Sequence, residues 1–574
     1  MNEPDLFSQD AKPANENPAP TRGNASNPVG LEPRIARSAL WAAYGDALGW
    51  ISELTDAAGL KRRTGGAPLD KPIAWKRRVG GRSGVTVTLP RGCYSDDTQL
   101  RLATGRAIRS DGFDVEAFAK VELPLWLSYG LGGGKSTSAA AAQLGRKNPA
   151  WWSNRFKGWT HSGGNGAAMR VQPHIWSART PSEPESYLAD VVRNSVCTHA
   201  HPTGLVGAVF HALCVAHAMR VGDLPSPDDL REVVRVADGL PEIISRDREL
   251  GYWRIAFEQE AGNFDESWAK AMNEIRETVD LISTCRTRAR GSDGYEAIAD
   301  TLKLREPARR GSGMLTAVAA VGLAWCEARP TEAMRIAANA IGTDTDTIAT
   351  MAGAILGATT DIDPPVDVLD DSMMRAEAKR LANIAAGESP SNHEYPDLLH
   401  WSAPKTRADA LARAKDGGLM VRGLGPARGM EGEPELASGE FQWQWIKLEF
   451  GQTILIKSRT RIPELEKERA PVEPRLSATV NEQRTSPPVV HQHRPRFDST
   501  GRKPPSEHDV PRVRTDTHDI RDVVAYVEKH IDNDQVVGRA LRRVVRKGTT
   551  GQVAAFNAAL IDLLRSHVES NEPG

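Results

Sequence analysis

Two acidic clusters, separated by much of the chain, carry the residue types best suited to chemistry. The first is the segment 95–98, Ser-Asp-Asp-Thr, and the second is the segment 342–347, Gly-Thr-Asp-Thr-Asp-Thr. Each is followed by apolar residues at helical spacing, which predicts that each cluster lies where a helix begins. If the fold brings the two helix starts together, four carboxylates and two or three hydroxyl groups share one small volume.

Carboxylates at such close quarters need a positive counter-charge. Two unit charges about 4 Å apart repel by roughly 4 kcal/mol at an effective dielectric constant near 20. Four carboxylates would not stay ionised together without a cation, and ligand sets made only of oxygen select hard divalent cations. For either cluster alone, helix capping is the favoured interpretation, because Ser, Thr and Asp are the best N-cap residues.

The chain around these clusters has a helical pattern. From residue 33 to about residue 390, stretches rich in Ala, Leu and Arg alternate with glycine-rich loops, and strand-like alternation is almost absent. This pattern predicts one large all-α domain over 33–390, with the functional residues on its loops. The stretches expected to be helices are 34–48, 100–109, 204–219, 315–328 and 347–358.

The segments on either side of this domain have a different composition. Residues 1–32 are rich in Asn, Pro, Ala and Gly and are expected to form a disordered tail. Residues 393–458 contain strand-like runs, and Gly451 stands where a hairpin could turn. These features predict a small β-containing module after the helical domain.

The end of the chain is expected to contain a linker and more helices. Residues 459–514 are rich in Pro, Arg, Ser and Glu, a composition typical of a flexible linker. Apolar stripes at helical spacing in 515–574 predict a C-terminal helical segment. A basic stripe beside them is most simply a solvated face, and docking of an acidic partner is the alternative. That stripe comprises Arg539, Arg542, Arg543, Arg546 and Lys547.

Five short motifs follow one another along the helical part of the chain. They are Gly45-Asp46-Ala47-Leu48-Gly49 followed by Glu53, then 95–98, then Gly164-Asn165-Gly166 with Met169-Arg170, then Thr198-His199, and finally Asp344-Thr345-Asp346-Thr347. In this order the motifs resemble those of the ADP-ribosylglycohydrolase family, and the similarity covers roughly residues 35–390.

The resemblance implies an all-α fold with a binuclear Mg²⁺ or Mn²⁺ site that cleaves the glycosidic bond between ADP-ribose and a protein side chain. It assigns the first metal-ligand set to Ser95, Asp96 and Asp97. It assigns the second to Asp344, Asp346 and Thr347. Ser95 stands where the family commonly has Thr, a change that keeps the hydroxyl ligand.

The resemblance also implies roles for residues beside the metals. Glu53 matches an acidic residue next to the ions, and either Asp97 or Glu53 would serve as the base or proton shuttle. The loop containing Gly164, Asn165 and Gly166 would offer backbone amides to a diphosphate, although a loop that merely starts a helix is the simpler interpretation without the resemblance. His199 is similar to a residue of the ADP-ribose pocket wall.

One further glycine-rich segment has a composition similar to a P-loop but not its spacing. The segment 130–136, Gly-Leu-Gly-Gly-Gly-Lys-Ser, looks like a nucleotide-binding P-loop but has one residue too few between its outer glycines. Counting back from Lys135, the required first glycine falls on Tyr129. A glycine loop that caps a helix over 136–144 explains the segment better.

The composition of the chain indicates its partners and its cellular compartment. The 574 residues include 73 Lys and Arg and 74 Asp and Glu, so a nucleic-acid partner is not expected. Five cysteines without paired spacing fit a reducing compartment. The polar N-terminus predicts that no signal peptide is present, and no segment is expected to reach the roughly 20 apolar residues that span a bilayer. A soluble cytoplasmic protein without a membrane partner is expected.

Three hypotheses follow. The first is a metal-dependent hydrolase that removes ADP-ribose from an ADP-ribosylated protein or from a small ADP-ribose conjugate. The second is a non-catalytic ADP-ribose-binding scaffold that recruits a protein partner through its C-terminal module. The third, a P-loop nucleotide hydrolase, fails on spacing. The sequence alone does not define the linkage, the metal, the base or the oligomeric state.

Overall fold

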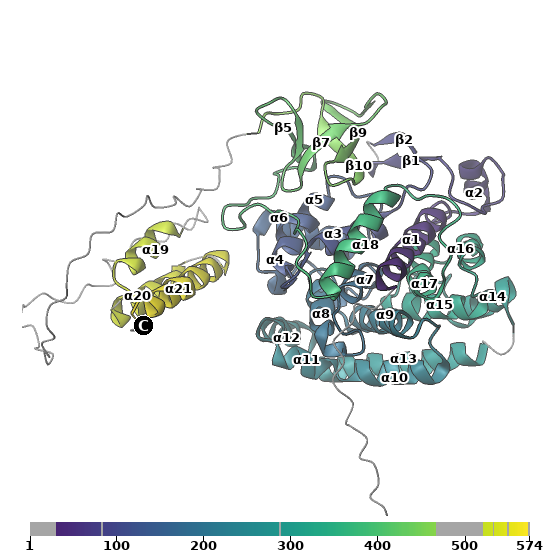
Figure 1. The fold of residues 1–574 in the computed structure, drawn as a ribbon, viewed down its shortest axis with the longest axis horizontal. Coiled ribbons are helices and arrows are strands. Elements are labelled where there is room, and N and C mark those ends of the chain that lie inside the picture. Colours follow the sequence, from purple (N-terminus) through teal and green to yellow (C-terminus); the bar gives the residue numbers. More distant parts are fainter. Residues whose placement is uncertain are drawn as a thin grey trace, which may run out of the picture.

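The computed structural model describes residues 30–81, 84–285, 289–465, 520–531, 533–547 and 550–571. Helices pack around one large hydrophobic core, and an antiparallel sheet lies at one end of them (Figure 1). The predicted fold class, a large helical domain with a small β-containing module and C-terminal helices, is confirmed.

The helices of the large domain include all five that the sequence predicted. The longer ones are α1 (Leu31–Gly49), α2 (Ala57–Thr64), α3 (Asp96–Arg106), α6 (Lys135–Lys147), α8 (Leu188–Val196), α9 (Pro202–Val221), α10 (Pro227–Asp238), α12 (Arg248–Ala261), α13 (Phe264–Cys285), α14 (Gly291–Thr301), α15 (Gly313–Cys326), α16 (Pro330–Asn339), α17 (Thr345–Thr359) and α18 (Asp371–Ala385). The shorter ones are α4 (Val115–Ala117), α5 (Leu123–Trp126), α7 (Gln172–Trp176) and α11 (Leu240–Arg246).

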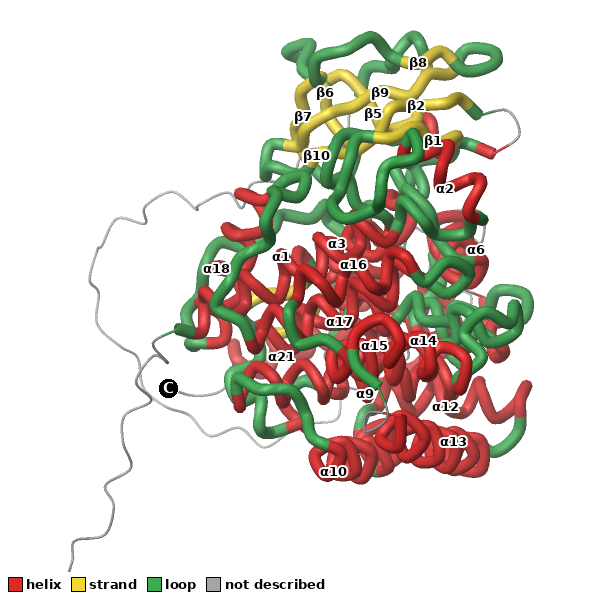
Figure 2. Tube along the Cα trace, turned by 90° about the vertical axis from the view of Figure 1, so that its right-hand side faces the viewer, coloured by secondary structure: helices red, strands yellow, loops and turns green. Residues whose placement is uncertain are grey.

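Helices α1 and α17, from opposite ends of the domain sequence, pack tightly together at its centre (Figures 1 and 2). A Cβ atom added to Gly49 of α1 would lie 2.3 Å from the carbonyl oxygen of Thr345 in α17. One added to Gly353 of α17 would lie 2.4 Å from the carbonyl oxygen of Trp41. Since no real side chain tolerates such distances, glycine at these positions lets the two backbones meet and brings the start of α17 to the end of α1.

A β-hairpin interrupts the range that the sequence pattern assigned to helices alone. Strands β1 (Trp75–Val79) and β2 (Val85–Leu89) pair antiparallel, with Trp75 opposite Leu89. Trp75, Val87 and Leu89 are buried, while the residues between them along each strand are exposed or half-buried. The all-helical expectation was therefore wrong here, although the alternation of Val85, Val87 and Leu89 is the ordinary signal of a half-buried strand.

The C-terminal sheet packs on the helical domain and shares its core. Its strand order is β10-β9-β7-β6-β5, and β8 pairs with β9. Buried Trp401, Trp443 and Ile446 belong to the same hydrophobic cluster as the helices. The predicted hairpin is present, with Lys447 opposite Thr453 and Gly451 in the turn at φ 104°. The strands are β5 (Leu411–Arg413), β6 (Leu419–Val421), β7 (Gly425–Gly429), β8 (Glu435–Leu436), β9 (Phe441–Leu448) and β10 (Thr453–Arg459).

Three C-terminal helices form a separate small core. They are α19 (Arg521–Glu528), α20 (Asp534–Lys547) and α21 (Thr550–Asn571), and Val523, Val544 and Phe556 are buried among them. The predicted tail lies outside the described residues up to residue 29, and α1 begins at Leu31, inside the range 1–32 assigned to that tail. The predicted linker lies outside the described residues from residue 466 onward.

One helix corrects the expectation about membrane-length segments. Helix α9 has 20 residues and is apolar enough, by length and composition alone, to cross a membrane. Within the structure, 83% of its most apolar window is buried against other helices. A core helix of a globular domain meets the same criterion, and the packing of α9 against α15, α17 and α8 places it in that class.

Candidate active site and metal centre

A cavity of about 490 Å³ lies where the end of α1, the starts of α3 and α17 and two glycine-rich loops meet. The two acidic clusters, far apart in sequence, both line it. The structure therefore brings together every predicted site residue except Ser95. Those lining the cavity are Glu53, Asp96, Asp97, Gly164, Asn165, Gly166, His199, Asp344, Asp346 and Thr347.

Asp46 of α1 holds the start of α3 in place. Its carboxylate accepts hydrogen bonds from the backbone N–H of Ser95 (2.9 Å), the backbone N–H of Thr98 (3.0 Å) and the Thr98 hydroxyl (2.6 Å). Arg101 donates to the hydroxyls of Thr98 and Thr350, so α17 joins the same buried network. Sequence reasoning missed this role, for which the available signal is an acidic residue within an apolar helical stretch.

Ser95 acts in the structure as the N-cap of α3. Its side-chain oxygen accepts a hydrogen bond from the Asp97 backbone N–H at 3.2 Å. The side chain is fully buried and is not among the residues that line the described cavity. The capping interpretation therefore describes this residue in the structure, and its assignment as a metal ligand stays a prediction.

The two clusters touch through Thr347 and Asp97. The Thr347 hydroxyl lies 3.5 Å from Oδ1 of Asp97, and the Asp97 side chain is almost fully buried. Its second oxygen, Oδ2, is buried with no hydrogen-bond partner among the described residues. A buried carboxylate oxygen without a partner is costly, and it is a donor suited to a cation.

The electrostatic environment of the cavity disfavours the ionised forms of its acidic side chains. Burial raises the pKa of Asp97 and of Asp346 well above the ordinary value, and neighbouring carboxylates raise it further. Burial, with Glu53 and Asp46 nearby, raises the pKa of Asp96 to about 8. Burial and the Asp344 carboxylate raise the pKa of Glu53 to about 7. A cation among these groups would relieve the repulsion and favour their ionised forms.

The residues fit a hard divalent cation by donor type and charge. Carboxylates and hydroxyls are the oxygen donors that Mg²⁺ and Mn²⁺ prefer. The unpartnered Oδ2 atom of Asp97 supports the same fit. In the described part of the chain, however, no three or more His, Cys, Asp or Glu side chains stand together with the spacing of a formed metal centre.

The Gly164–Gly166 loop forms another wall of the cavity. Its Asn165 N–H donates to the carbonyl of Gly311 (2.9 Å), and its Asn165 side-chain amide donates to Oδ2 of Asp344 (2.8 Å). A Cβ atom on Gly166 would lie 2.8 Å from Cε1 of His199, so any larger residue there would displace the His199 ring. The loop is thus tied directly to the second acidic cluster.

His199 is a buried, neutral wall residue. Its Nδ1 lies 2.8 Å from the Thr198 hydroxyl, and burial together with the Arg170 charge lowers its pKa to about 3. Arg170 donates to the Gly166 carbonyl at 2.7 Å and to the Thr198 hydroxyl at 2.8 Å. Arg170 therefore holds the Gly164–Gly166 loop and the Thr198-His199 segment together. This contact gives the arginine of the motif a structural role.

The glycine-rich segment that fails as a P-loop also lines the cavity. Gly132 to Thr137 contribute to its wall, and α6 begins at Lys135 after an N-cap at Gly134. The helix-capping prediction is confirmed, but the location of this loop in the site was not foreseen. Gly132 has φ 120°, and a Cβ atom there would lie 2.3 Å from Oδ1 of Asp96. Lys135 and Arg77 add positive charge to a cavity rich in acids.

Comparison with known protein families agrees with this architecture. The sequence model described as ADP-ribosylglycohydrolase matches residues 28–391, which include both acidic clusters and every residue of the cavity named above. The match covers well over half of the chain and ends before the C-terminal sheet. The family consists of hydrolases that act on ADP-ribose conjugates and are generally metal-dependent. The chain described here belongs to the ADP-ribosylglycohydrolase family.

Proposed function

We propose that this protein removes ADP-ribose from modified protein side chains by metal-dependent hydrolysis of the glycosidic bond. The observation that carries the proposal is the meeting of the two acidic clusters in one cavity, where Thr347 lies 3.5 Å from Asp97. Helix capping alone does not require four carboxylates to line one cavity, where they repel one another.

The proposed cofactor is a pair of Mg²⁺ or Mn²⁺ ions. When bound, two such ions orient sugar hydroxyls and acidify a bound water. The oxygen-only donor set and the buried, unpartnered oxygen of Asp97 support this choice. The residues that would hold the ions are Ser95, Asp96, Asp97, Asp344, Asp346 and Thr347.

The proposed substrate lies between the acids and the glycine-rich walls. Backbone at Gly164 and at Gly133 can approach a diphosphate closely because these residues have no side chain. Lys135 at the same wall offers a positive charge to that diphosphate. His199, buried and neutral, excludes water on the far side without adding charge.

Glu53 is the proposed proton carrier, with Asp97 as the alternative. A proton carrier must reach both the reacting groups and solvent, and Glu53 lines the cavity while its side chain stays 20% exposed. Its carboxylate lies 3.7 Å from the Arg77 guanidinium, which stacks on the ring of Trp50. These contacts hold Glu53 at the cavity while leaving it partly accessible to solvent.

A cytoplasmic location is part of the same proposal. The five cysteines are buried, free thiols, as expected for a protein that works in a reducing compartment. A modified protein is the proposed binding partner, whereas no role for nucleic acid follows from the near-neutral charge.

The test is an assay of the purified protein against a panel of defined conjugates. Arginine-linked and serine-linked ADP-ribosyl peptides and acetylated ADP-ribose would each be incubated with and without EDTA. Release of ADP-ribose that EDTA stops, and that Asp97→Ala and Asp346→Ala abolish, is the expected result. Full activity of the double variant under chelation would refute the proposal. Cleavage of acetylated ADP-ribose alone would indicate a hydrolase of small conjugates, and tight ADP-ribose binding without turnover would indicate a scaffold.

A further inference from the structure

The C-terminal sheet lies outside the residues matched by the family, yet it is linked through Asp370 to Tyr94, the residue just before the first acidic cluster. We propose that this sheet positions the cluster, with Tyr94, Asp370 and Thr453 as positioning residues between them. The inference rests on the proposed function in one respect only, namely that metal binding is one of its readouts.

Asp370 is the centre of the connection. Its carboxylate accepts hydrogen bonds from the Tyr94 hydroxyl (2.9 Å), the Thr453 backbone N–H (2.6 Å) and the Thr453 hydroxyl (2.7 Å). The ammonium group of Lys447, on strand β9, lies 3.9 Å away. Three donors and a nearby cation thus converge on one side chain that is only 8% exposed.

The backbone of Asp370 is held in an unusual conformation. Its φ is 64° and its ψ is 27°, in the left-handed region that residues other than glycine seldom adopt. Such a conformation persists only where the surroundings impose it. The contacts to Tyr94 and Thr453 are the surroundings that do so.

Tyr94 carries the connection directly into the acidic cluster. It precedes Ser95, which begins the segment 95–98, and its side chain is almost fully buried. The backbone just before it is also fixed, because the Leu369 N–H donates to the Gly92 carbonyl at 3.0 Å. A Cβ atom on Gly92 would lie 2.9 Å from the Val368 Cα, so the two segments pack without space between them.

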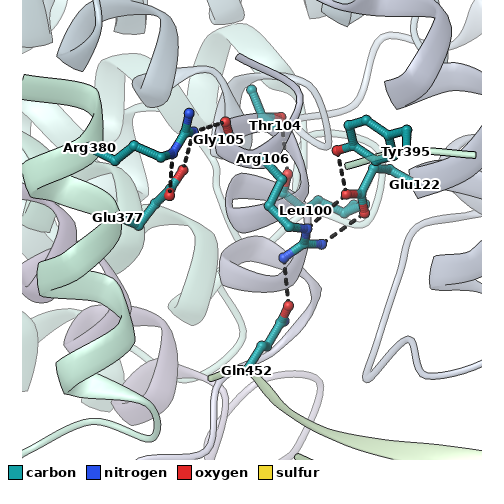
Figure 3. A network of polar contacts seen from close by, with 9 residues as sticks. All are labelled: Leu100, Thr104, Gly105, Arg106, Glu122, Glu377, Arg380, Tyr395 and Gln452. Atoms are coloured by element: carbon teal, nitrogen blue, oxygen red, sulfur yellow. Dashed lines mark hydrogen bonds and ion pairs between the residues drawn. The ribbon is translucent and has the colours of Figure 1, made fainter. Parts of the chain in front are cut away.

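A second link joins the sheet to the other end of α3. Gln452, the neighbour of Thr453, accepts a hydrogen bond at 2.6 Å from the guanidinium of Arg106, the last residue of α3. The same guanidinium binds the Glu122 carboxylate through two nitrogens, each at 2.8 Å, and Tyr395 donates to that carboxylate (Figure 3). Gln452, in the turn before β10, therefore contacts the end of α3 directly, and Thr453 is linked through Asp370 and Tyr94 to its start.

Because α3 is a short rigid element, fixing both of its ends fixes the acids at its start. Ligand geometry must hold within fractions of an ångström for metal binding, and supporting residues outside the ligand set commonly affect affinity. Loss of the connection should therefore weaken metal binding without removing any ligand.

The experiment uses the full-length protein with Tyr94→Phe and Thr453→Val, each of which deletes one hydroxyl and keeps the side-chain shape. Thr460→Val is the matched control, since Thr460 follows the same sheet and its exposed hydroxyl contacts the Glu440 carbonyl at 3.4 Å. The first readout is the Mn²⁺ dissociation constant from calorimetry. The second is hydrogen–deuterium exchange of the amides in 92–102, at a temperature where every variant is folded.

We expect the two variants to bind Mn²⁺ about 5- to 30-fold more weakly than wild type and to exchange faster over 95–99. Thr453→Ser, which keeps the hydroxyl, should have the Mn²⁺ dissociation constant and the exchange rate of wild type. Thr460→Val should leave both quantities unchanged. Wild-type exchange over 95–99 in both variants would overturn the inference, as would a change only in melting temperature. If the wild-type protein itself failed to bind Mn²⁺, the proposed metal centre would fail, and the exchange data would still decide the positioning role.

Discussion

The Asp46 carboxylate of α1 accepts a 2.6 Å hydrogen bond from the Thr98 hydroxyl of α3, and this contact fixes how two helices meet at the cavity. The same carboxylate caps two backbone N–H groups at the start of α3, in a position that is fully buried. Asp46 therefore has a structural role, because its contacts place Asp96 and Asp97 beside the start of α17.

Asp46→Ala should destabilise the protein far more than an ordinary lost cap. It leaves two buried backbone N–H groups and the Thr98 hydroxyl without their acceptor, which costs on the order of 3 kcal/mol. Asp56→Ala is the matched control, because Asp56 caps α2 at its exposed start through the Gly59 N–H, and its loss should cost about 1 kcal/mol. Urea unfolding followed by tryptophan fluorescence measures both. Equal losses in the two variants would contradict the role assigned to Asp46.

Gly49→Ala should separate α1 from α17 and impair the site. The added methyl group would lie 2.3 Å from the Thr345 carbonyl oxygen, a distance that forces the helices apart. We expect a loss of a few kcal/mol in stability and of most ADP-ribose release.

The matched control for this substitution is Gly251→Ala in α12. No described atom lies within 4 Å of a Cβ atom at that position, so alanine should stabilise the helix by about 0.5–1 kcal/mol. Thermal melting and the hydrolysis assay on both variants make the comparison. Unchanged melting and activity in Gly49→Ala would show that the close approach of the two helices is not required.

The sequence predicted the parts of the site that depend on local pattern. Helix starts at Asp96 and Thr345 follow from hydroxyl and acidic residues before apolar stripes, and the structure has both. Their convergence was a conditional expectation, because a contact across 250 residues, such as Thr347 with Asp97, is decided by tertiary packing.

Other parts of the site have no local signature. The role of Asp46 as a cap depends on a helix that starts 50 residues later. Lys135 lies in a segment whose spacing does not match a P-loop, but spacing does not reveal which wall a loop forms. The hairpin β1–β2 was overlooked because each strand has only five residues within a helical background.

Asp97→Asn should stabilise the metal-free protein while removing its response to metal. Burial and three neighbouring carboxylates raise the pKa of Asp97 well above its ordinary value, so a neutral amide relieves repulsion in the apo state. We expect a gain on the order of 1 kcal/mol for the variant in EDTA. In wild type, Mn²⁺ at 100 times its dissociation constant should add about 2.7 kcal/mol, because a ligand of the folded state stabilises it.

The measurement is thermal melting of both proteins in EDTA and in excess Mn²⁺. The order of stability should reverse between the two conditions, with the variant higher in EDTA and wild type higher in Mn²⁺. Asp111→Asn, at an exposed loop position, should leave both melting temperatures unchanged. A Mn²⁺ response that survives in Asp97→Asn would show that this residue is not a ligand.

Buried histidines should make the protein sensitive to acid. His211 of α9 is fully buried, accepts a hydrogen bond from the Gln172 amide at 2.9 Å, and has its pKa lowered to about 3 by burial and by Arg101. Below pH 6.5 the unfolded chain takes up a proton at this position while the folded protein does not. The contribution of His211 to the free energy of unfolding therefore falls by up to about 1.4 kcal/mol for each pH unit between 6.5 and 3, and it is constant above pH 7.

His211→Gln should reduce that slope, because glutamine keeps a polar group beside Gln172 but takes up no proton. His161→Gln, at an exposed position, is the control that should leave the slope as in wild type. Urea unfolding at pH 7, 6, 5 and 4 gives the four free energies needed for each protein. The slope, not the value at pH 7, is the informative quantity, since packing changes shift all four free energies together. A slope for His211→Gln equal to that of wild type would mean that His211 takes up its proton in the folded protein as readily as in the unfolded chain, and would contradict its burial as the cause of acid sensitivity.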